Sequence, residues 1–285
     1  MQAKRDFIEL QSKRHGLVSM ERFKTIEEYF LYLIHLKAYE EAAKLAKDKI
    51  VLDYGCNNGY GTSVISPCCK EVIGLDVSSK AIKQAKKIFE SENTHFNICN
   101  GTDIPFESKK FDLVVSFQVI EHISDPKKYL SEIKRVLSKN GVAIFTTPNA
   151  QVRLDPGMRP WHPFHAREYT ADELKNLLIE QFARVHIQGL FGKEPIHSTE
   201  LNRLKRARLT ARKRARWVNA ISAKLRVVLP EPIKNFIRTS LDRIRDQHHK
   251  LNPQVLQEYS TKDLSYYDNE LDKALDLMAI CSDED

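Results

Sequence analysis

The sequence of 285 residues has no apolar run that approaches the roughly 20 residues of a membrane-spanning helix. Residues 1–14 are polar and show no apolar core of a secretory signal peptide. No disulfide or zinc spacing links the five cysteines, Cys56, Cys68, Cys69, Cys99 and Cys281. These absences argue against a membrane-spanning, secreted or disulfide-stapled protein, and we expect a cytoplasmic one.

Most of the chain has no surplus of positive charge, because the basic residues are concentrated in one segment. Residues 193–250 hold sixteen Lys and Arg against five Asp and Glu, while the formal net charge of the whole chain is +7. The remainder is therefore net negative. This asymmetry predicts that one segment forms a basic surface with a role of its own.

The stretch that organises the chain is residues 50–61, IVLDYGCNNGYG. A short aliphatic run ends in an acidic residue and three glycines, and Thr62 can open a helix that Pro67 stops. The run predicts a buried parallel strand, and glycine lets the chain turn sharply and lets a ligand approach the backbone. A strand, a glycine turn and a helix form the nucleotide-binding corner of a doubly wound α/β sheet.

The spacing of Gly55, Gly59 and Gly61 does not fit the dinucleotide fingerprint G-x-G-x-x-G. It resembles motif I of the class I S-adenosylmethionine-dependent methyltransferases, roughly D-x-G-C-G-x-G. Asn57 replaces the middle glycine, and asparagine tolerates left-handed backbone angles better than most residues. The resemblance implies S-adenosyl-L-methionine as the cofactor. It assigns five residues of this stretch to the cofactor site: Asp53, Gly55, Cys56, Asn57 and Gly59.

A second strand is predicted over residues 71–76 and ends in Asp76, twenty-one residues after Gly55. A carboxylate at that offset can accept hydrogen bonds from a ribose diol. This segment resembles motif II of the same family, and Val77 is assigned to the cofactor with it. The alternative is that Asp76 only caps a helix or holds a turn.

The resemblance extends to two later segments. In the family, an aspartate after the third strand accepts from the adenine amino group, and the next apolar residue packs on the ring. Asp103 and Ile104 hold those places, although Asp103 could be a plain turn residue. The fourth strand, residues 111–117, continues into QVIEHI, an ending typical of the family, so Gln118 is also assigned to the cofactor.

We therefore predict an α/β, Rossmann-like fold with a doubly wound sheet of seven strands. The sixth strand is predicted at 182–190, but the seventh emerges only at 274–281. The family closes its sheet with a reversed hairpin of strands six and seven. Residues 192–270 are then a basic helical insertion in that hairpin.

The predicted domain division follows from this insertion. Residues 1–49 form an arm and a helix that covers the cofactor or only packs on the domain. The methyltransferase domain comprises residues 50–191 together with 271–285.

Two histidines are candidate general bases. His122 follows the fourth strand, and His165 lies in a loop, residues 150–169, that leaves the fifth strand on the ligand side. Either can accept a proton near neutral pH. His122 could equally be a core residue or support the base, and His165 could only anchor its loop. Glu121 is the third candidate catalytic residue, because it could orient a histidine or help to hold a metal.

A metal is not expected to be obligatory. Similar ubiquinone-pathway and small-RNA 2′-O-methyltransferases bind a divalent ion through an E-x-x-E-H segment. Here Gln118 stands at the first glutamate position, and a neutral amide is a weaker ligand for a hard cation.

The resemblance, to the methyltransferase-11 type, covers roughly residues 45–190 and the last strand, and it leaves the acceptor open. The segment PFHAREY, residues 163–169, and the late insertion are loosely similar to enzymes of glycan-assembly systems. The leading hypothesis is in-line methyl transfer to a hydroxyl of a sugar, a glycan or a related small molecule, with lipid-linked glycans included. The alternatives are an RNA 2′-O-methyltransferase and a non-catalytic S-adenosylmethionine-binding module.

The basic insertion leaves three roles open. It could be a lid over the acceptor, or residues 200–240 could lie on an anionic membrane surface at the inner face of the membrane. It could also grip the phosphates of nucleic acid. No aromatic-rich RNA-binding motif accompanies the charge, so nucleic acid is the less favoured partner.

Overall fold

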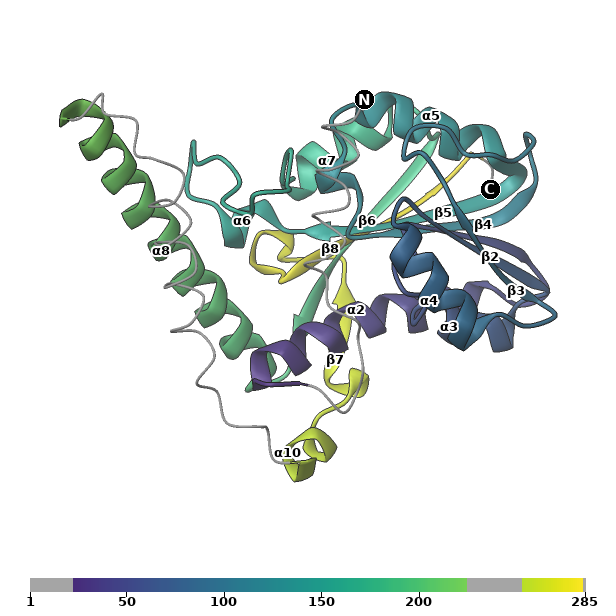
Figure 1. The fold of residues 1–285 in the computed structure, drawn as a ribbon, viewed down its shortest axis with the longest axis horizontal. Helices are drawn as coiled ribbons and strands as arrows, with labels where there is room; N and C mark the ends of the chain where they lie inside the picture. The colour runs from purple at the N-terminus through teal and green to yellow at the C-terminus, as the bar shows by residue number, and fades with distance from the viewer. Residues whose placement is uncertain (1–22, 225–252, 284–285) are drawn as a thin grey trace.

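We describe residues 23–224 and 253–283 in a computed structural model. They form a mixed sheet of eight strands with helices on both faces (Figure 1). From one edge to the other, the strands are β3 (Thr94–Ile98), β2 (Glu71–Asp76), β1 (Ile50–Tyr54), β4 (Phe111–Phe117), β5 (Leu137–Pro148), β8 (Asp276–Ser282), β6 (Arg184–Gly192) and β7 (Leu264–Tyr267).

The first five strands of the chain are parallel, with β1 paired to both β2 and β4. Strands buried on both faces are apolar throughout, which is why these runs were recognisable in the sequence. The last three strands are antiparallel, because β8 runs back between β5 and β6, and β7 pairs with β6. The carboxyl ends of β1, β2, β4 and β5 therefore share one rim with the start of β8.

Two layers of helices cover the sheet. α2 (Ile26–Leu45), α3 (Thr62–Ile65) and α4 (Ser79–Phe89) lie on one face, and α5 (Pro126–Val136) and α7 (Ala171–Leu178) lie on the other (Figure 1). α5 begins with an Asp125 side-chain cap followed by proline, and α7 begins with a capping box. The short helix α6 (Ala150–Arg153) follows β5 directly.

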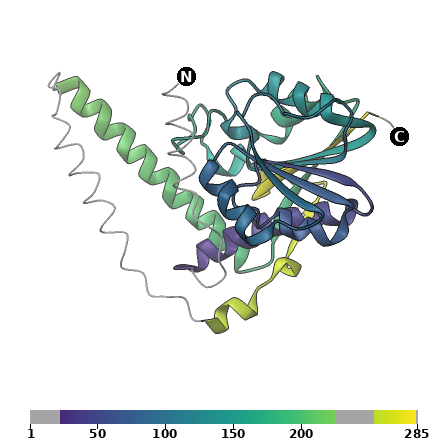
Figure 2. The ribbon, with the colours of Figure 1, turned by 45° about the vertical axis from the view of Figure 1, so that its right-hand side comes forward.

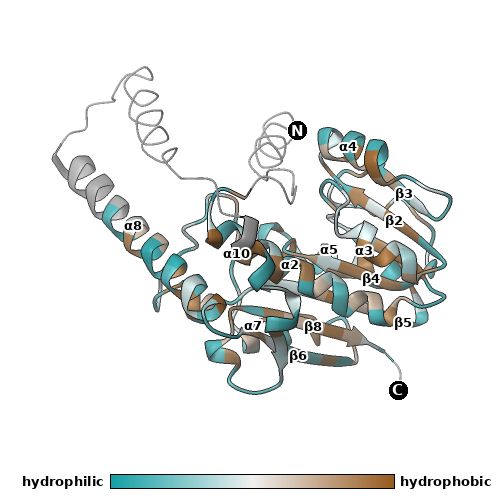
Figure 3. Ribbon diagram, turned by 90° about the horizontal axis from the view of Figure 1, so that it is seen from below, coloured by the Kyte–Doolittle hydropathy of each residue, from teal (hydrophilic) through white to brown (hydrophobic). Residues whose placement is uncertain are grey.

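The long helix α8 (Ile196–Lys224) stands away from the sheet (Figure 2). Its first turns are anchored, because Ile196 and Leu204 are buried and Arg206 pairs with Glu27 of α2 at 2.9 Å. Beyond them, the described part of the helix is largely hydrophilic (Figure 3). α10 (Pro253–Glu258) then leads into the last two strands.

The structure corrects the predicted sheet in one respect. It has eight strands, because β7 lies inside the segment that was predicted to be a helical insertion. The late strand between β5 and β6 is confirmed, starting at Asp276. The domain division itself stays a prediction, and residues 225–252 of the insertion lie outside the described residues.

Within the described ranges, none of the helices combines the length and the apolar character needed to cross a membrane.

Candidate active site

The glycine corner after β1 has the backbone that the sequence predicts. Gly55 and Gly59 adopt φ angles of +95° and +80°, and Asn57 adopts +50°. A Cβ atom on Gly55 would lie 2.4 Å from a methyl group of Val119, and one on Gly59 would lie 2.7 Å from the ring of Phe96. Only glycine combines these angles with this close packing. The glycines therefore let the corner pack closely against Val119 and Phe96.

Asp76 holds the corner against the end of β2. Its Oδ2 accepts from the backbone N–H of Asn57 at 2.9 Å, and its Oδ1 accepts from that of Ser78 at 2.8 Å. Burial raises the pKa of Asp76, and these backbone hydrogen bonds act in the opposite direction. A carboxylate has about four acceptor positions, so lone pairs remain for the two hydroxyls of a ribose.

Asp53 and Cys56 lie beneath the corner rather than at its surface. The Asp53 carboxyl is fully buried and accepts from the hydroxyl of Thr62 at 2.6 Å and from that of Tyr39 at 3.4 Å. Burial raises its pKa to about 7. Cys56 is buried in a small apolar cluster beside Phe96. Asp53 thus joins β1 to α3 and α2, and direct cofactor contacts of both side chains stay predictions.

The predicted adenine side lies at the loop after β3. Asp103 is exposed, pairs with Lys128 at 2.9 Å and accepts from Asn100 at 3.0 Å. Ile104 is buried, and the Cβ of a residue at Gly101 would touch Val77 at 2.9 Å. Asp103, Ile104 and Val77 therefore lie near one another along the rim, and their contacts to adenine stay predictions.

The Gln118 side chain forms hydrogen bonds within the protein. Its backbone has a φ of +56°, and its amide donates to both carboxyl oxygens of Asp276, at 3.1 and 2.9 Å, and to Thr146 at 3.3 Å. Asp276 opens β8 and is buried. Sequence reasoning missed this partner, since 158 residues separate the pair. The predicted contact between Gln118 and the cofactor stays a prediction.

Asp276 gives a pH-dependent prediction. Burial raises its pKa to about 8, so at neutral pH the folded protein holds a proton there that the unfolded chain releases. Stability from this group is present at low pH and is lost as the pH rises from about 4 to about 8. As the pH rises from 5 to 8, the unsubstituted protein should therefore lose stability that Asp276→Asn keeps. The unfolding free energy of Asp276→Asn should rise relative to that of the unsubstituted protein by on the order of 3 kcal/mol over this range. Denaturant titrations at each pH measure it.

The matched control for this prediction is Asp268→Asn, which changes an exposed carboxylate. Its stability should run parallel to that of the unsubstituted protein across the pH range. Parallel curves for Asp276→Asn as well would show that Asp276 is ionised in the folded state.

The three predicted catalytic residues come together beyond the ends of β4 and β5. The ring centroids of His122 and His165 are 4.8 Å apart, and Nε2 of His122 lies 4.0 Å from Oε1 of Glu121. Glu121 is buried and accepts from the hydroxyl of Thr147 at 3.2 Å, and burial raises its pKa to about 8. Its backbone carbonyl also accepts from the N–H of Ala166 at 2.7 Å, which ties the loop of His165 to the short 3-10 helix η2 (Ile120–His122) that follows β4.

The histidines have different partners at Nδ1. His122 donates from Nδ1 to the carbonyl of Phe164 at 2.9 Å, whereas Nδ1 of His165 lies 2.7 Å from Glu168. Burial lowers the pKa of His165 and outweighs the opposing effect of Glu168. Glu168 also pairs with Arg153. Sequence reasoning gave no role to Arg153 or Glu168, although the spacing of three residues from His165 to Glu168 was visible.

Glu121, His122 and His165 could also hold a metal ion, because one ligand atom from each lies within 4.8 Å of the other two. One carboxylate with two imidazoles suits a transition-metal ion such as zinc or iron better than magnesium. Gln118, turned toward Asp276, does not belong to this group. The expectation that no metal is obligatory stays a prediction.

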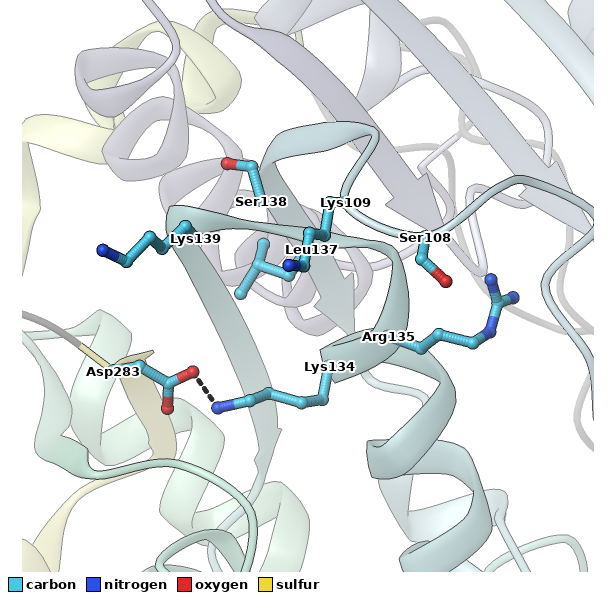
Figure 4. Close-up of a pocket in the computed structure, with 8 residues that line it drawn as sticks. All are labelled: Ser108, Lys109, Lys134, Arg135, Leu137, Ser138, Lys139 and Asp283. Atoms are coloured by element: carbon cyan, nitrogen blue, oxygen red, sulfur yellow. Dashed lines mark hydrogen bonds and ion pairs between the residues drawn. The ribbon is translucent and has the colours of Figure 1, made fainter.

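A separate hollow of about 380 Å³ lies at the other end of the sheet, where β5 begins and β8 ends (Figure 4). Lys134 forms an ion pair there with Asp283, and Arg135 is engaged by Glu132 and by backbone carbonyls. The hollow is remote from the histidines, so we assign it no part in the candidate active site. Its lining is Ser108, Lys109, Lys134, Arg135, Leu137, Ser138, Lys139 and Asp283.

A doubly wound sheet with a glycine corner after β1, an acid ending β2 and a reversed last strand beside β5 defines the class I methyltransferase fold. A family model described as a methyltransferase domain matches residues 45–187, half of the chain. The chain therefore belongs to the methyltransferase domain family.

Individual relatives agree with this assignment. A probable S-adenosylmethionine-dependent methyltransferase of Mycobacterium tuberculosis is 34% identical over 168 residues, 58% of this chain and 60% of that protein. A tRNA U34 carboxymethyltransferase of Campylobacter fetus is 38% identical over 104 residues, 35% of this chain and 37% of that protein. The solved YcgJ protein of Bacillus subtilis shares the fold, with a TM-score of 0.51 at 17% identity, covering 88% of this chain and 99% of that one. The chain thus spans less than two thirds of the curated relatives' length.

Proposed function

We propose that this chain uses S-adenosyl-L-methionine to methylate a hydroxyl group, with a sugar, a glycan or a related small molecule as the acceptor. The family membership and the cofactor named for the Mycobacterium relative support the cofactor. The turn geometry of the glycine corner and the remaining acceptor positions of Asp76 support a nucleoside at this rim. When bound, S-adenosylmethionine supplies an electrophilic methyl group.

The observation that carries the proposal is the grouping of His122, His165 and Glu121 where β4 and β5 end. A hydroxyl acceptor must lose its proton as it attacks, and a positioned base contributes about 10²- to 10⁴-fold. We assign this role to His165, because Glu168 at 2.7 Å can stabilise the imidazolium that forms.

The proposed step is a direct displacement. With S-adenosylmethionine bound, the acceptor oxygen would form its bond to the methyl carbon as the carbon–sulfur bond breaks, with S-adenosylhomocysteine as the leaving group. The proton of the hydroxyl passes to Nε2 of His165. The protein's contribution is to hold acceptor and base in line, which can supply an effective molarity of about 10⁵ M or more.

The helix α8 supports a contact with the acceptor or with the surface that presents it. Arg208 lies 3.6 Å from Asp155 in the loop that carries His165, and Arg212 pairs with the same carboxylate. The basic helix is therefore connected to the acceptor side of the site. We propose that it faces an anionic membrane surface bearing a lipid-linked acceptor. Within residues 196–213 of this helix, the basic residues are Arg203, Lys205, Arg206, Arg208, Arg212 and Lys213.

RNA 2′-O-methylation is the second candidate. Two observations favour it, the basic helix α8 and the similarity to a tRNA carboxymethyltransferase. RNA bound through this helix should dissociate steeply as salt is added, because neutralised phosphates regain their counterions.

The experiment that tests the proposed function is methyl transfer from tritiated S-adenosylmethionine to a panel of acceptors. The panel contains free and nucleotide-activated sugars, a lipid extract with glycolipids, and total RNA, each with and without added divalent metal. We expect saturable transfer to a sugar hydroxyl, located by mass spectrometry. Transfer to RNA alone would replace the first candidate by the second, and cofactor binding without transfer to any acceptor would favour a non-catalytic module.

A further inference from the structure

We propose that Glu168, held by Arg153, is a positioning residue that fixes the ring orientation and tautomer of His165. The inference rests on the proposed function for its catalytic consequence, but the arrangement itself can be tested without an acceptor.

The Glu168 carboxylate is inaccessible to solvent and fully engaged. Its Oε1 lies 2.7 Å from Nδ1 of His165 and accepts from one guanidinium nitrogen of Arg153 at 3.1 Å. Its Oε2 accepts from Nε of Arg153 at 2.9 Å. The side chain of Glu168 is 0% exposed, and those of Arg153 and His165 are each 8% exposed. Such a two-point ion pair gives geometric definition that a single contact would not.

Arg153 has a second partner besides Glu168. Its guanidinium carbon lies 4.5 Å from the centre of the Trp161 ring, within the range of a cation–π contact. Both contacts hold the guanidinium in place, and the guanidinium in turn holds the Glu168 carboxylate.

This ion pair closes the base of the loop that carries His165. Arg153 is the last residue of α6, the short helix that follows β5, and Glu168 precedes Tyr169. Tyr169 forms a parallel bridge with Asn149, and its carbonyl accepts from Ala150 at 2.9 Å. The two ends of the loop are thus joined by backbone pairing, and the ion pair lies one residue inside that pairing on the Tyr169 side.

The chemical consequence follows from the donor and acceptor inventory. A carboxylate can only accept, so the hydrogen bond at 2.7 Å requires the proton of neutral His165 to be on Nδ1. Nε2 then keeps its lone pair. Nε2 is therefore the atom that would take a proton from an acceptor or bind a metal. Without Glu168, the imidazole could rotate or change tautomer.

A purely structural staple is the competing explanation, and the experiment separates the two. Long-range ¹H–¹⁵N correlation spectra of the ¹⁵N-histidine-labelled full chain report the tautomer of His165, whose signals are assigned by their loss in His165→Gln. We expect the Nδ1–H tautomer in the unsubstituted protein. In Glu168→Ala we expect loss of that preference, with the affinity for S-adenosylhomocysteine unchanged. The conservative Glu168→Asp should restore part of it.

A matched control removes another Arg–Glu pair beside the same loop. Glu173→Gln breaks the exposed pair with Arg167 and should leave the His165 signals as they are. On the acceptor identified in the transfer assay, Glu168→Ala should lower kcat by about 10- to 100-fold with little change in KM. Should Glu168→Ala not fold, Glu168→Leu keeps most of the volume, offers no acceptor to Nδ1 of His165 and takes its place.

The outcomes are distinguishable. An unchanged His165 tautomer in folded Glu168→Ala, or an Nε2–H tautomer in the unsubstituted protein, would overturn the positioning role whatever the acceptor is. Loss of the Nδ1–H preference in Glu168→Ala, together with no methyl transfer by the unsubstituted protein, would sustain the positioning role and refute the proposed function.

Discussion

Replacing His165 by alanine should lower kcat for methyl transfer by about 10²- to 10⁴-fold, which is the contribution of a positioned general base. The glycine corner and Asp76 lie at the ends of β1 and β2, so the affinity for S-adenosylhomocysteine should be retained. His165 is the better base of the two histidines because its Nδ1 faces a carboxylate, whereas that of His122 faces a carbonyl. Steady-state rates with the identified acceptor and calorimetric titration measure the two effects.

A histidine outside the site provides the control for this experiment. His186 lies on β6, and its side chain is 54% exposed. His186→Ala should keep full activity and the same melting temperature. An unchanged kcat in His165→Ala would remove His165 from the chemistry, and the same measurement on His122→Ala would then identify the base.

The second large effect concerns the cofactor. Asp76→Ala should raise the dissociation constant for S-adenosylhomocysteine by about 10- to 100-fold, or about 1–3 kcal/mol, because the ribose hydroxyls lose their acceptor. The same substitution leaves the N–H groups of Asn57 and Ser78 without their partner, which loosens the glycine corner. Isothermal calorimetry gives the affinity, and thermal melting shows whether the fold persists.

Two further variants calibrate that result. Asp76→Asn keeps one oxygen acceptor and should have an intermediate affinity. Asp103→Ala should have a smaller effect than Asp76→Ala, because Asp103 is exposed and water replaces a lost hydrogen bond there. Equal affinity of Asp76→Ala and the unsubstituted protein would mean that the ribose is held elsewhere.

The parallel half of the fold could be predicted because its signals are local. Each of β1, β2 and β4 is a short and mostly apolar run, and the rim begins where the run ends. β8 was recognisable for the same reason, even though it is far from β6 in the sequence. β7 was missed because four residues at a sheet edge, Leu264–Tyr267, have no distinct pattern.

The site was predicted less completely, because its hydrogen bonds join distant segments. Asp53 matches a cofactor motif, but its partners Tyr39 and Thr62 come from α2 and α3, which the motif does not include. Gln118 likewise matches a cofactor motif, and its side chain donates a hydrogen bond to Asp276 of the last strand, which the motif does not include. The grouping of His122 and His165 depends on the path of a loop that only the structure defines. Residue types at strand ends predict where a site lies, and the pairing of their side chains has to be seen.

The central claim is that the rim of β1, β2 and β4 binds S-adenosylmethionine, and calorimetric titration of the full chain with S-adenosylhomocysteine tests it most directly. NAD is the control ligand, because a dinucleotide is what a doubly wound sheet most often binds otherwise. We expect micromolar binding of S-adenosylhomocysteine with a stoichiometry of about one, and no binding of NAD. Binding of NAD instead, or of neither ligand at millimolar concentration, would contradict the cofactor assignment and the proposed methyl transfer with it.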